Sequence, residues 1–142
     1  KVNKKGMLPF FVKSSNEVRA NKAIQKYFKK NRFKLNRFKK KSKFIGLKRK
    51  NEIICSGWIY FGNEFLLEEI NKKIKLNKQY LLYDFITEKK FRNMGYYQLL
   101  LRIIQNKFQK KRLIIYALSN NKKSVRAIEK SGFKLIRKLK KY

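Results

Sequence analysis

The second half of the chain alternates between two hydrophobic patterns, and this alternation constrains the fold more than any other feature. Runs rich in β-branched and aromatic residues predict strands at 79–87, 112–118 and 133–139, and helical patterns occupy 95–107 and 122–130. A helix that crosses between two strands of one sheet makes those strands parallel, with a right-handed connection. We therefore expect an α/β fold, in which helices flank a mixed central β-sheet.

The first half is expected to add antiparallel strands and further helices to this sheet. Two apolar runs, 43–48 and 52–61, flank the short polar turn 49–51 and predict a hairpin. The helices expected here cover 16–30, with Ser14 or Ser15 as the cap, and 64–73. No repeat or Pro- or Gly-rich linker interrupts the chain, so we expect a single domain over 1–142, with 1–50 its least diagnostic part.

Two residue types that often carry chemistry are scarce. The chain has no histidine, which removes the most common general base and the most common zinc ligand. Cys55 is the only cysteine, so no internal disulfide can form and no metal site is expected. Because Cys55 stands in an apolar run, we expect it to be buried in the core rather than reactive.

The net charge of +32 arises from 40 basic residues and eight acidic ones. Such a field attracts phosphates, whether on CoA, a nucleotide, RNA or an anionic membrane. Coding bias is the alternative, because lysines outnumber arginines 31 to nine and Asn, Ile, Phe and Tyr, which AT-rich coding sequences favour, are abundant. Both explanations stay open at this point.

A basic segment, 26–50, contains no acidic residue and carries four interleaved phenylalanines, Phe28, Phe33, Phe38 and Phe44. Basic residues mixed with aromatic ones can form a surface for RNA or another polyanion. The alternative, which we favour, is a solvated helix and loop whose phenylalanines anchor it to the core.

A strand, a basic loop and the start of a helix follow one another in the second half. The loop contains the run Phe91-Arg92-Asn93-Met94-Gly95-Tyr96-Tyr97. The N–H groups at a helix N-terminus converge, and the helix dipole adds positive potential there, which suits a diphosphate. Gly95 allows the backbone to turn sharply and to approach phosphates closely.

A second segment, 121–133, predicts a short helix that ends at a glycine before the next strand. In their order and spacing the two segments resemble the GNAT N-acetyltransferase superfamily, whose members have the acyl-CoA N-acyltransferase fold. The family loop reads Arg/Gln-x-x-Gly-x-Gly/Ala and is matched at Arg92 and Gly95, with Tyr97 in place of the last small residue. The family's later helix reads Asn-x-x-Ala/Ser-x-x-x-x-x-Lys-x-Gly-Phe and is matched at Asn121, Ser124, Lys130, Gly132 and Phe133.

The resemblance covers 79–139 and implies a V-shaped splay between the parallel strands at 79–87 and 112–118. Acetyl-CoA would lie in the splay, with its pantetheine arm along 85–87 and its pyrophosphate on the amides of 92–97. Lys89, Lys90 and Lys130 would add positive charge near the phosphates. The implied cofactor-binding residues are Phe85, Ile86, Thr87, Arg92, Asn93, Met94, Gly95, Tyr96, Tyr97, Asn121, Ser124 and Lys130.

The activity that the resemblance implies is transfer of an acetyl group to a primary amine of an amino sugar, a small amine or a protein. The departing thiolate then needs an acid. Many relatives supply a tyrosine at the position that Ile128 occupies here. Solvent can replace it, or one of the tyrosines Tyr96, Tyr97 and Tyr116, and Tyr97 is the candidate catalytic residue among them.

The amine must also lose a proton, and Asp84 is the first candidate base. On the period-two pattern of a strand it shares a face with Leu82 and Ile86, where burial would raise the pKa of its carboxyl. An ion pair between Asp84 and a lysine at the strand edge is the alternative. Glu88, at the mouth of the splay, is the second candidate base.

A different class of function stays open, namely a GNAT-like domain of weak or no catalysis that acts as a basic RNA-binding or ribosome-associated component. No apolar run reaches about 20 residues, so no membrane span is expected. We expect a cytoplasmic location, or an organellar matrix if a leader preceded Lys1. The family often has another strand after the last one expected here, which a partner in a homodimer can supply.

Overall fold

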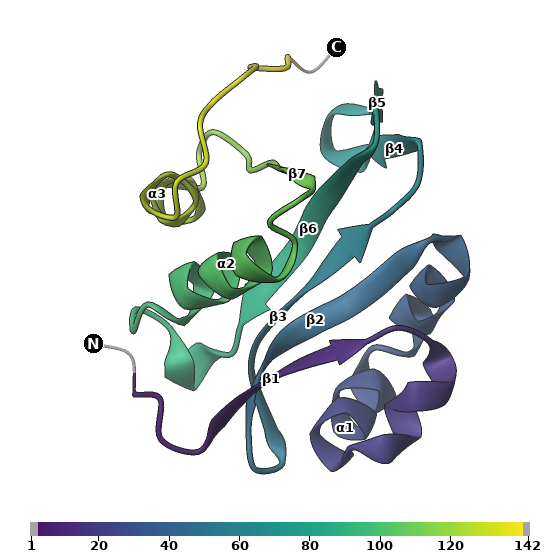
Figure 1. Cartoon of the computed structure of the whole chain (residues 1–142), viewed down its shortest axis with the longest axis vertical. Coiled ribbons are helices and arrows are strands. Elements are labelled where there is room, and N and C mark those ends of the chain that lie inside the picture. The colour runs from purple at the N-terminus through teal and green to yellow at the C-terminus, as the bar shows by residue number, and fades with distance from the viewer. Residues whose placement is uncertain (1–2, 141–142) are drawn as a thin grey trace.

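The computed structural model describes residues 3–140 and shows a five-stranded mixed sheet with helices on both faces (Figure 1). The strands lie in the order β1 (Met7–Val12), β2 (Ser42–Arg49), β3 (Glu52–Tyr60), β6 (Gln79–Thr87) and β7 (Arg112–Ile115). β1 pairs with β2, β2 with β3 and β3 with β6, all antiparallel, whereas β6 and β7 are parallel. The predicted mixed sheet, its hairpin and its parallel pair are therefore confirmed.

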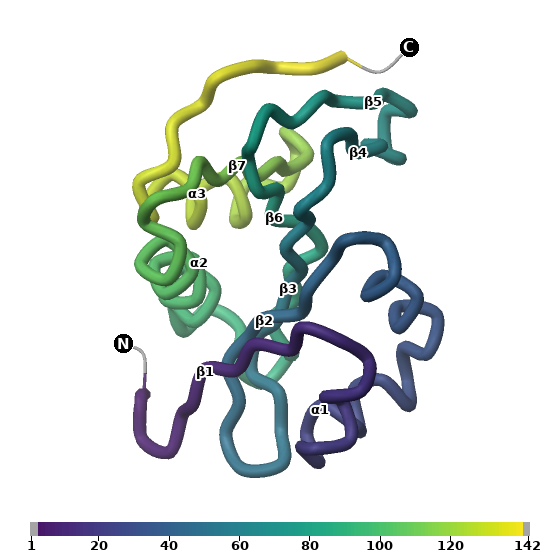
Figure 2. The backbone as a smooth tube through the Cα atoms, turned by 45° about the vertical axis from the view of Figure 1, so that its right-hand side comes forward, coloured from purple at the N-terminus to yellow at the C-terminus, as the bar shows by residue number. Residues whose placement is uncertain are grey.

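The helices divide between the two faces, as Figure 2 shows from another side. One face carries α1 (Lys22–Lys30) and two 3₁₀ helices, η1 (Ser15–Ala20) and η2 (Arg32–Lys40); α2 (Tyr96–Lys107) covers the other face, with α3 (Lys122–Lys130) beside it. The single helix predicted over 16–30 is wrong in one respect. It breaks at Asn21, which has an extended backbone and caps α1 by accepting the N–H of Ile24 at 3.1 Å.

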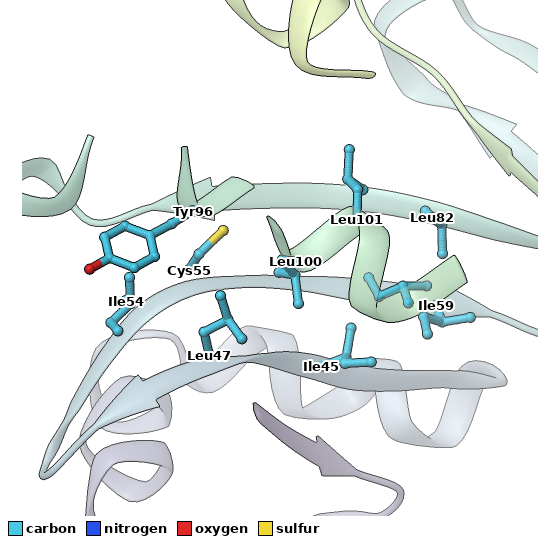
Figure 3. Close-up of a cluster of buried hydrophobic side chains, with 10 residues drawn as sticks. Ile45, Leu47, Ile54, Cys55, Ile59, Leu82, Tyr96, Leu100 and Leu101 are labelled. Carbon is cyan, nitrogen blue, oxygen red and sulfur yellow. The ribbon is translucent and has the colours of Figure 1, made fainter. Parts of the chain in front are cut away.

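The face under α2 forms the larger apolar core (Figure 3). Leu100, Leu101 and Ile104 of α2 are fully buried against β2, β3 and β6. A buried Leu or Ile contributes about 1.5–3 kcal/mol, so these side chains fix α2 firmly on the sheet. Cys55 is fully buried in the same cluster, as predicted.

The face under α1 and η2 is packed with aromatic rings. Phe44 and Trp58 are fully buried, Phe28 lies 5.1 Å from Phe44, and Phe38 lies 5.2 Å from Trp58, measured between ring centroids. The interpretation of the phenylalanines in 26–50 as anchors is thus confirmed for three of the four. Phe33 is the exception, since it is 72% exposed.

The helix predicted over 64–73 is wrong. This segment forms a hairpin of β4 (Glu64–Leu67) and β5 (Lys72–Lys75), joined by a 3₁₀ turn, η3 (Glu68–Ile70). Asn71 takes a left-handed conformation at the turn, with φ of 51°. The ring of Phe65 packs against Tyr60 and Tyr83 at 5.1 and 4.9 Å, and these contacts hold the hairpin against the main sheet.

The two ends of the described chain also differ from the prediction. β1 was not predicted, and Pro9 within it is tolerated because β1 is an edge strand. The strand predicted over 133–139 is wrong, because that segment is irregular and leaves Leu135 and Ile136 about 70% exposed. The strand predicted over 112–118 ends early, at Ile115.

Candidate active site

The two parallel strands separate partway along their length. β6 pairs with β7 only from Gln79 to Leu82, yet β6 continues to Thr87. After Ile115 the chain leaves the sheet and turns towards α3 (Figure 1). Within the described residues, the β6 edge beyond Leu82 therefore has no strand beside it, and the predicted splay is present.

A β-bulge lies in the part of β6 that borders the splay. Tyr83 pairs with Trp58 and Ile86 with Ser56, so Gly57 alone faces both Asp84 and Phe85. Asp84 has φ of 53°, and the ring of Phe85 lies over Gly57, where any side chain would overlap it. The bulge changes the side-chain alternation of β6.

The period-two pattern predicted that Asp84 shares a face of the sheet with Leu82. Because of the bulge, Asp84 points instead towards η2. Its Oδ2 atom lies 2.9 Å from the Lys34 ammonium and 2.7 Å from the Arg37 guanidinium. Burial alone would raise the pKa of Asp84, but the hydrogen bonds from Arg37 and Lys34 outweigh it and hold the pKa below its ordinary value. The expected raised pKa is therefore wrong, and the structure shows the alternative, an ion pair.

The loop after β6 leads directly into the N-terminus of α2. It contains the 3₁₀ turn η4 (Lys89–Phe91), and the Arg92 Nε atom donates to the carbonyl of Thr87 at 2.9 Å. Gly95 ends the loop in a left-handed conformation, with φ of 85°, and is the N-cap of α2. A glycine cap offers no side chain to the first N–H groups of the helix, so these groups stay available to an anion.

Side chains of α3 connect the two sequence motifs. The Asn121 side chain accepts the N–H of Ser124 at 3.2 Å and so caps α3, and Ser124 shares a hydrogen bond of 3.4 Å with the Tyr97 hydroxyl. Lys123 donates to the side chain of Asn93 in the loop at 3.3 Å. The start of α3 is thereby held beside the start of α2.

Lys130 is a predicted cofactor-binding residue that the structure does not bring to the loop. It ends α3, whose nine residues span about 13 Å at the usual helical rise. Its carbonyl accepts a 3.4 Å hydrogen bond from Arg102, more than a turn along α2 from Tyr97. The charge of Lys130 is therefore distant from the amides at the start of α2.

The three candidate tyrosines occupy different surroundings. Tyr97 is half-buried beside Phe85, with 5.7 Å between ring centroids, and burial raises the pKa of its hydroxyl. Tyr96 is buried, and its hydroxyl accepts from Arg49 at 3.0 Å and donates to the carbonyl of Asn3 at 2.9 Å, away from the splay. Tyr116 follows β7, and burial raises its pKa as well.

The remaining predicted residues lie along the end of β6 and the loop. Ile86 and Met94 are exposed, and the Thr87 hydroxyl donates to the Cys55 sulfur at 3.2 Å. Glu88 is exposed where β6 ends, and its backbone N–H donates to the carbonyl of Ile54 at 2.9 Å. Its carboxylate is thus accessible from solvent.

A hollow of about 630 Å³ beside the loop was not predicted. Its lining residues are Asn3, Arg49, Lys50, Glu52, Lys90, Phe91, Met94 and Tyr96. Three of these side chains are cationic, and only Lys90 is paired with the carboxylate of Glu52. The basic run at the end of β2 was the available signal, but only the fold shows that it lies next to the loop.

Within residues 3–140, no three carboxylate, thiol or imidazole groups lie close enough together to hold a metal ion. No helix in this part of the chain is sufficiently long and apolar to cross a bilayer.

Comparison with known proteins shows similarity at the level of structure. No protein-family model matches the sequence, and no curated protein matches it. Among solved structures, the aminoglycoside acetyltransferase meta-AAC0020 from an uncultured soil metagenomic sample, in complex with trehalose, is similar with a TM-score of 0.66 and 8% identity, over 97% of this chain and 95% of that one.

Two further solved structures are similar over 96% of this chain and 96% of their own. AAC(6')-Iy in complex with the bisubstrate analogue CoA-S-monomethyl-acetylneamine has a TM-score of 0.64 and 10% identity. The ribosomal-protein-alanine N-acetyltransferase from Brucella melitensis biovar Abortus 2308 has a TM-score of 0.60 and 8% identity. At these identities the likeness shows a shared fold.

Proposed function

We propose that this chain, which has the GNAT fold, binds acetyl-CoA and transfers its acetyl group to a primary amine. The observation that carries the proposal is that β6 continues beyond its pairing with β7 into a loop that ends at the N-terminus of α2, where no side chain caps the helix. AAC(6')-Iy, which shares the fold, has been solved with CoA and with a CoA-based bisubstrate analogue.

The donor would bind along this path. A pantetheine amide can pair with the free edge of β6 near Phe85, Ile86 and Thr87, as an added strand would. The pyrophosphate would then meet the first N–H groups of α2 beyond Gly95. Arg92 and Asn93 lie in the same loop, and the cations of the neighbouring hollow extend the positive surface.

The acetyl transfer requires two proton movements. The amine nitrogen attacks the thioester carbonyl carbon, the C–S bond breaks, and CoA leaves as a thiolate that must gain a proton while the amine loses one. Tyr97 is the acid we propose, because Ser124 orients its hydroxyl beside the splay. Burial raises the pKa of this hydroxyl, which therefore carries its proton at neutral pH.

The base must accept a proton from the attacking amine. A carboxylate that already accepts from Lys34 and Arg37 is a weak proton acceptor, so the surroundings of Asp84 disfavour it for this step. Glu88 is exposed at the end of β6 and can accept the amine proton directly or through water. We therefore propose Glu88 ahead of Asp84.

The acceptor we propose is an amine whose molecule carries negative charge, such as a phosphate-linked amino sugar. The net charge of +32 repels polycations and attracts anions before any contact forms. The similar structures meta-AAC0020 and AAC(6')-Iy are named aminoglycoside acetyltransferases, and aminoglycosides are cationic acceptors. A neutral small amine and a protein amine are the other acceptor classes.

Calorimetric titration of the purified chain tests the donor site. We expect saturable one-to-one binding of acetyl-CoA and of CoA, each clearly tighter than ATP, at moderate salt. ATP binding of equal strength would show that charge alone is responsible and would overturn the donor site. Thiol release from acetyl-CoA, measured with acidic, neutral and cationic amines, then tests transfer, and no release with any amine would overturn the activity.

A further inference from the structure

The 3₁₀ helix η2 presents three distinct faces, because residues three apart share a face in such a helix. Lys34 and Arg37 occupy one face and bind Asp84. Leu35 and Phe38 occupy the second and pack into the aromatic core. The third face consists of Phe33, Asn36 and Lys39, all of which are exposed.

Phe33 is the unusual member of this third face. The other phenylalanines of 26–50 are core residues, whereas Phe33 is 72% exposed, with the Lys34 ammonium 5.8 Å from its ring centroid. A single exposed apolar residue is ordinary on a protein surface. The meaning of Phe33 therefore depends on its neighbours.

A hollow of about 360 Å³ lies between α1 and η2, next to this face. Its lining residues are Gln25, Phe28, Lys29, Arg32 and Leu35. The hollow thus combines apolar side chains with two cations and one amide, and its volume exceeds that of a nucleobase. Arg32, which lines it, directly precedes Phe33.

The surroundings of Phe33 are strongly cationic. The segment 26–50 has 13 basic residues and no acidic one. The carboxylate that contacts η2, that of Asp84, is already bound by Lys34 and Arg37. The exposed cations on α1, on η2 and directly after it are Lys22, Lys26, Lys29, Lys30, Arg32, Lys39, Lys40 and Lys41. An exposed ring within a dense cationic surface is the combination that single-stranded nucleic acids bind.

We propose that the face formed by α1 and η2 binds single-stranded RNA, with a base stacked on Phe33 and the exposed cations on the phosphates. Gln25 and Asn36 can bond base edges and ribose 2′-hydroxyls. This face lies across the sheet from α2 and from the loop between β6 and α2. It is therefore a separate site from the one proposed for acetyl-CoA (Figure 2).

An anionic membrane fits this face less well than RNA. A helix that lies on a bilayer needs a free apolar face. The apolar residues of α1, Ala23, Ile24 and Phe28, are all buried against the sheet. Phe33 alone offers too little apolar area for insertion.

The two kinds of contact predict different mutant behaviour. Removal of a stacking ring should weaken binding about fivefold or more at every salt concentration, without changing the salt dependence. Removal of one phosphate contact should reduce the slope of log affinity against log salt by about 0.7 for a single strand. Phe33→Ala and Lys39→Gln separate these effects, and Leu8→Ala is a matched control, since Leu8 is also exposed but lies on β1.

Fluorescence anisotropy with a labelled uridine oligonucleotide, titrated with the full chain over a KCl series, measures both quantities. We expect Phe33→Ala to lose affinity at constant slope, Phe33→Tyr to retain it, Lys39→Gln to reduce the slope, and Leu8→Ala to match the parent chain. Circular dichroism and acetyl-CoA titration should be unchanged in Phe33→Ala.

Three results would overturn the proposal. The first is equal RNA binding by Phe33→Ala and the parent chain, which would leave only unspecific charge. The second is equal affinity for a thymidine oligodeoxynucleotide, which would remove the assignment to RNA. The third is tighter binding to phosphatidylserine vesicles than to RNA, with Phe33→Ala losing the vesicles, which would indicate a membrane surface.

Discussion

The ammonium group of Lys34 lies 2.9 Å from the carboxylate of Asp84, although only 7% of the Lys34 side chain is exposed. Arg37 binds the same carboxylate oxygen at 2.7 Å. Two residues of η2 thus bind the bulge of β6 and hold η2 against the strand that borders the splay. The geometry makes Asp84 an anchor of the fold.

Asp84→Asn should lower the free energy of unfolding by about 3 kcal/mol, because it leaves the buried Lys34 ammonium without a charged partner. Urea unfolding measures the change. Lys73→Gln is the matched control, since the Lys73–Glu64 pair is exposed, 3.7 Å long and expected to contribute little. Addition of Lys34→Met to Asp84→Asn should restore part of the loss, and no recovery would contradict the anchoring role of this pair.

The same carboxylate should make stability depend on acid. Because the pKa of Asp84 is lower in the folded chain than in the unfolded one, the unfolded state binds the proton more readily. The stabilisation is then fully present above the ordinary pKa of an aspartate and is lost as the pH falls through the lowered pKa. Urea midpoints between about pH 2 and 5 should decline less steeply in Asp84→Asn than in the parent chain. Parallel curves would exclude Asp84 as the cause.

The second half of the chain was largely predictable from sequence because its local signals agree with the fold. Gly95 and Gly132 both have positive φ, 85° and 97°, at a helix start and just after a helix end, as the glycine positions indicate. The burial pattern of α2 follows its helical period. At these positions the local conformational preference and the tertiary packing favour the same structure.

Two of the failures occur where a long-range contact decides the structure. The segment around Phe65 has a helical composition, yet the rings of Tyr60 and Tyr83 hold it as a hairpin. The direction of Asp84 depends on a bulge opposite Gly57, and the period-two rule assumes that no bulge exists. Neither the partners of Phe65 nor the bulge can be found from neighbouring residues.

Gly95→Ala should weaken acetyl-CoA binding, because a left-handed φ of 85° costs a non-glycine residue about 1–2 kcal/mol and the loop would shift. Gly95→Glu should abolish binding, since it adds bulk and negative charge where the pyrophosphate is proposed. Gly132→Ala is the matched control, with a comparable φ of 97° and open space around it, at the far end of α3. Calorimetry should show normal binding in that control, and equal losses in both alanine variants would contradict a role specific to the loop.

Cys55 should be inert in the folded chain. Burial raises the pKa of its thiol to about 12, so almost none of the reactive thiolate is present at neutral pH. We expect a disulfide reagent such as DTNB to react slowly with the native chain at pH 8 and completely once urea unfolds it. Rapid stoichiometric reaction of the native chain would show that the splay exposes this sulfur.

Tyr97→Phe should reduce the turnover of acetyl transfer about 100-fold, the usual contribution of a positioned acid, and leave acetyl-CoA affinity unchanged. The hydroxyl is held by Ser124, and its raised pKa keeps it protonated where an ordinary tyrosine begins to ionise. The rate in the parent chain should therefore not fall through ionisation of this group until above about pH 10. Tyr96→Phe is the matched control, because the Tyr96 hydroxyl bonds Arg49 and Asn3 instead, so the loss should be about 1 kcal/mol of stability rather than turnover. If both variants turn over as the parent chain does, solvent protonates the thiolate and Tyr97 is not the acid.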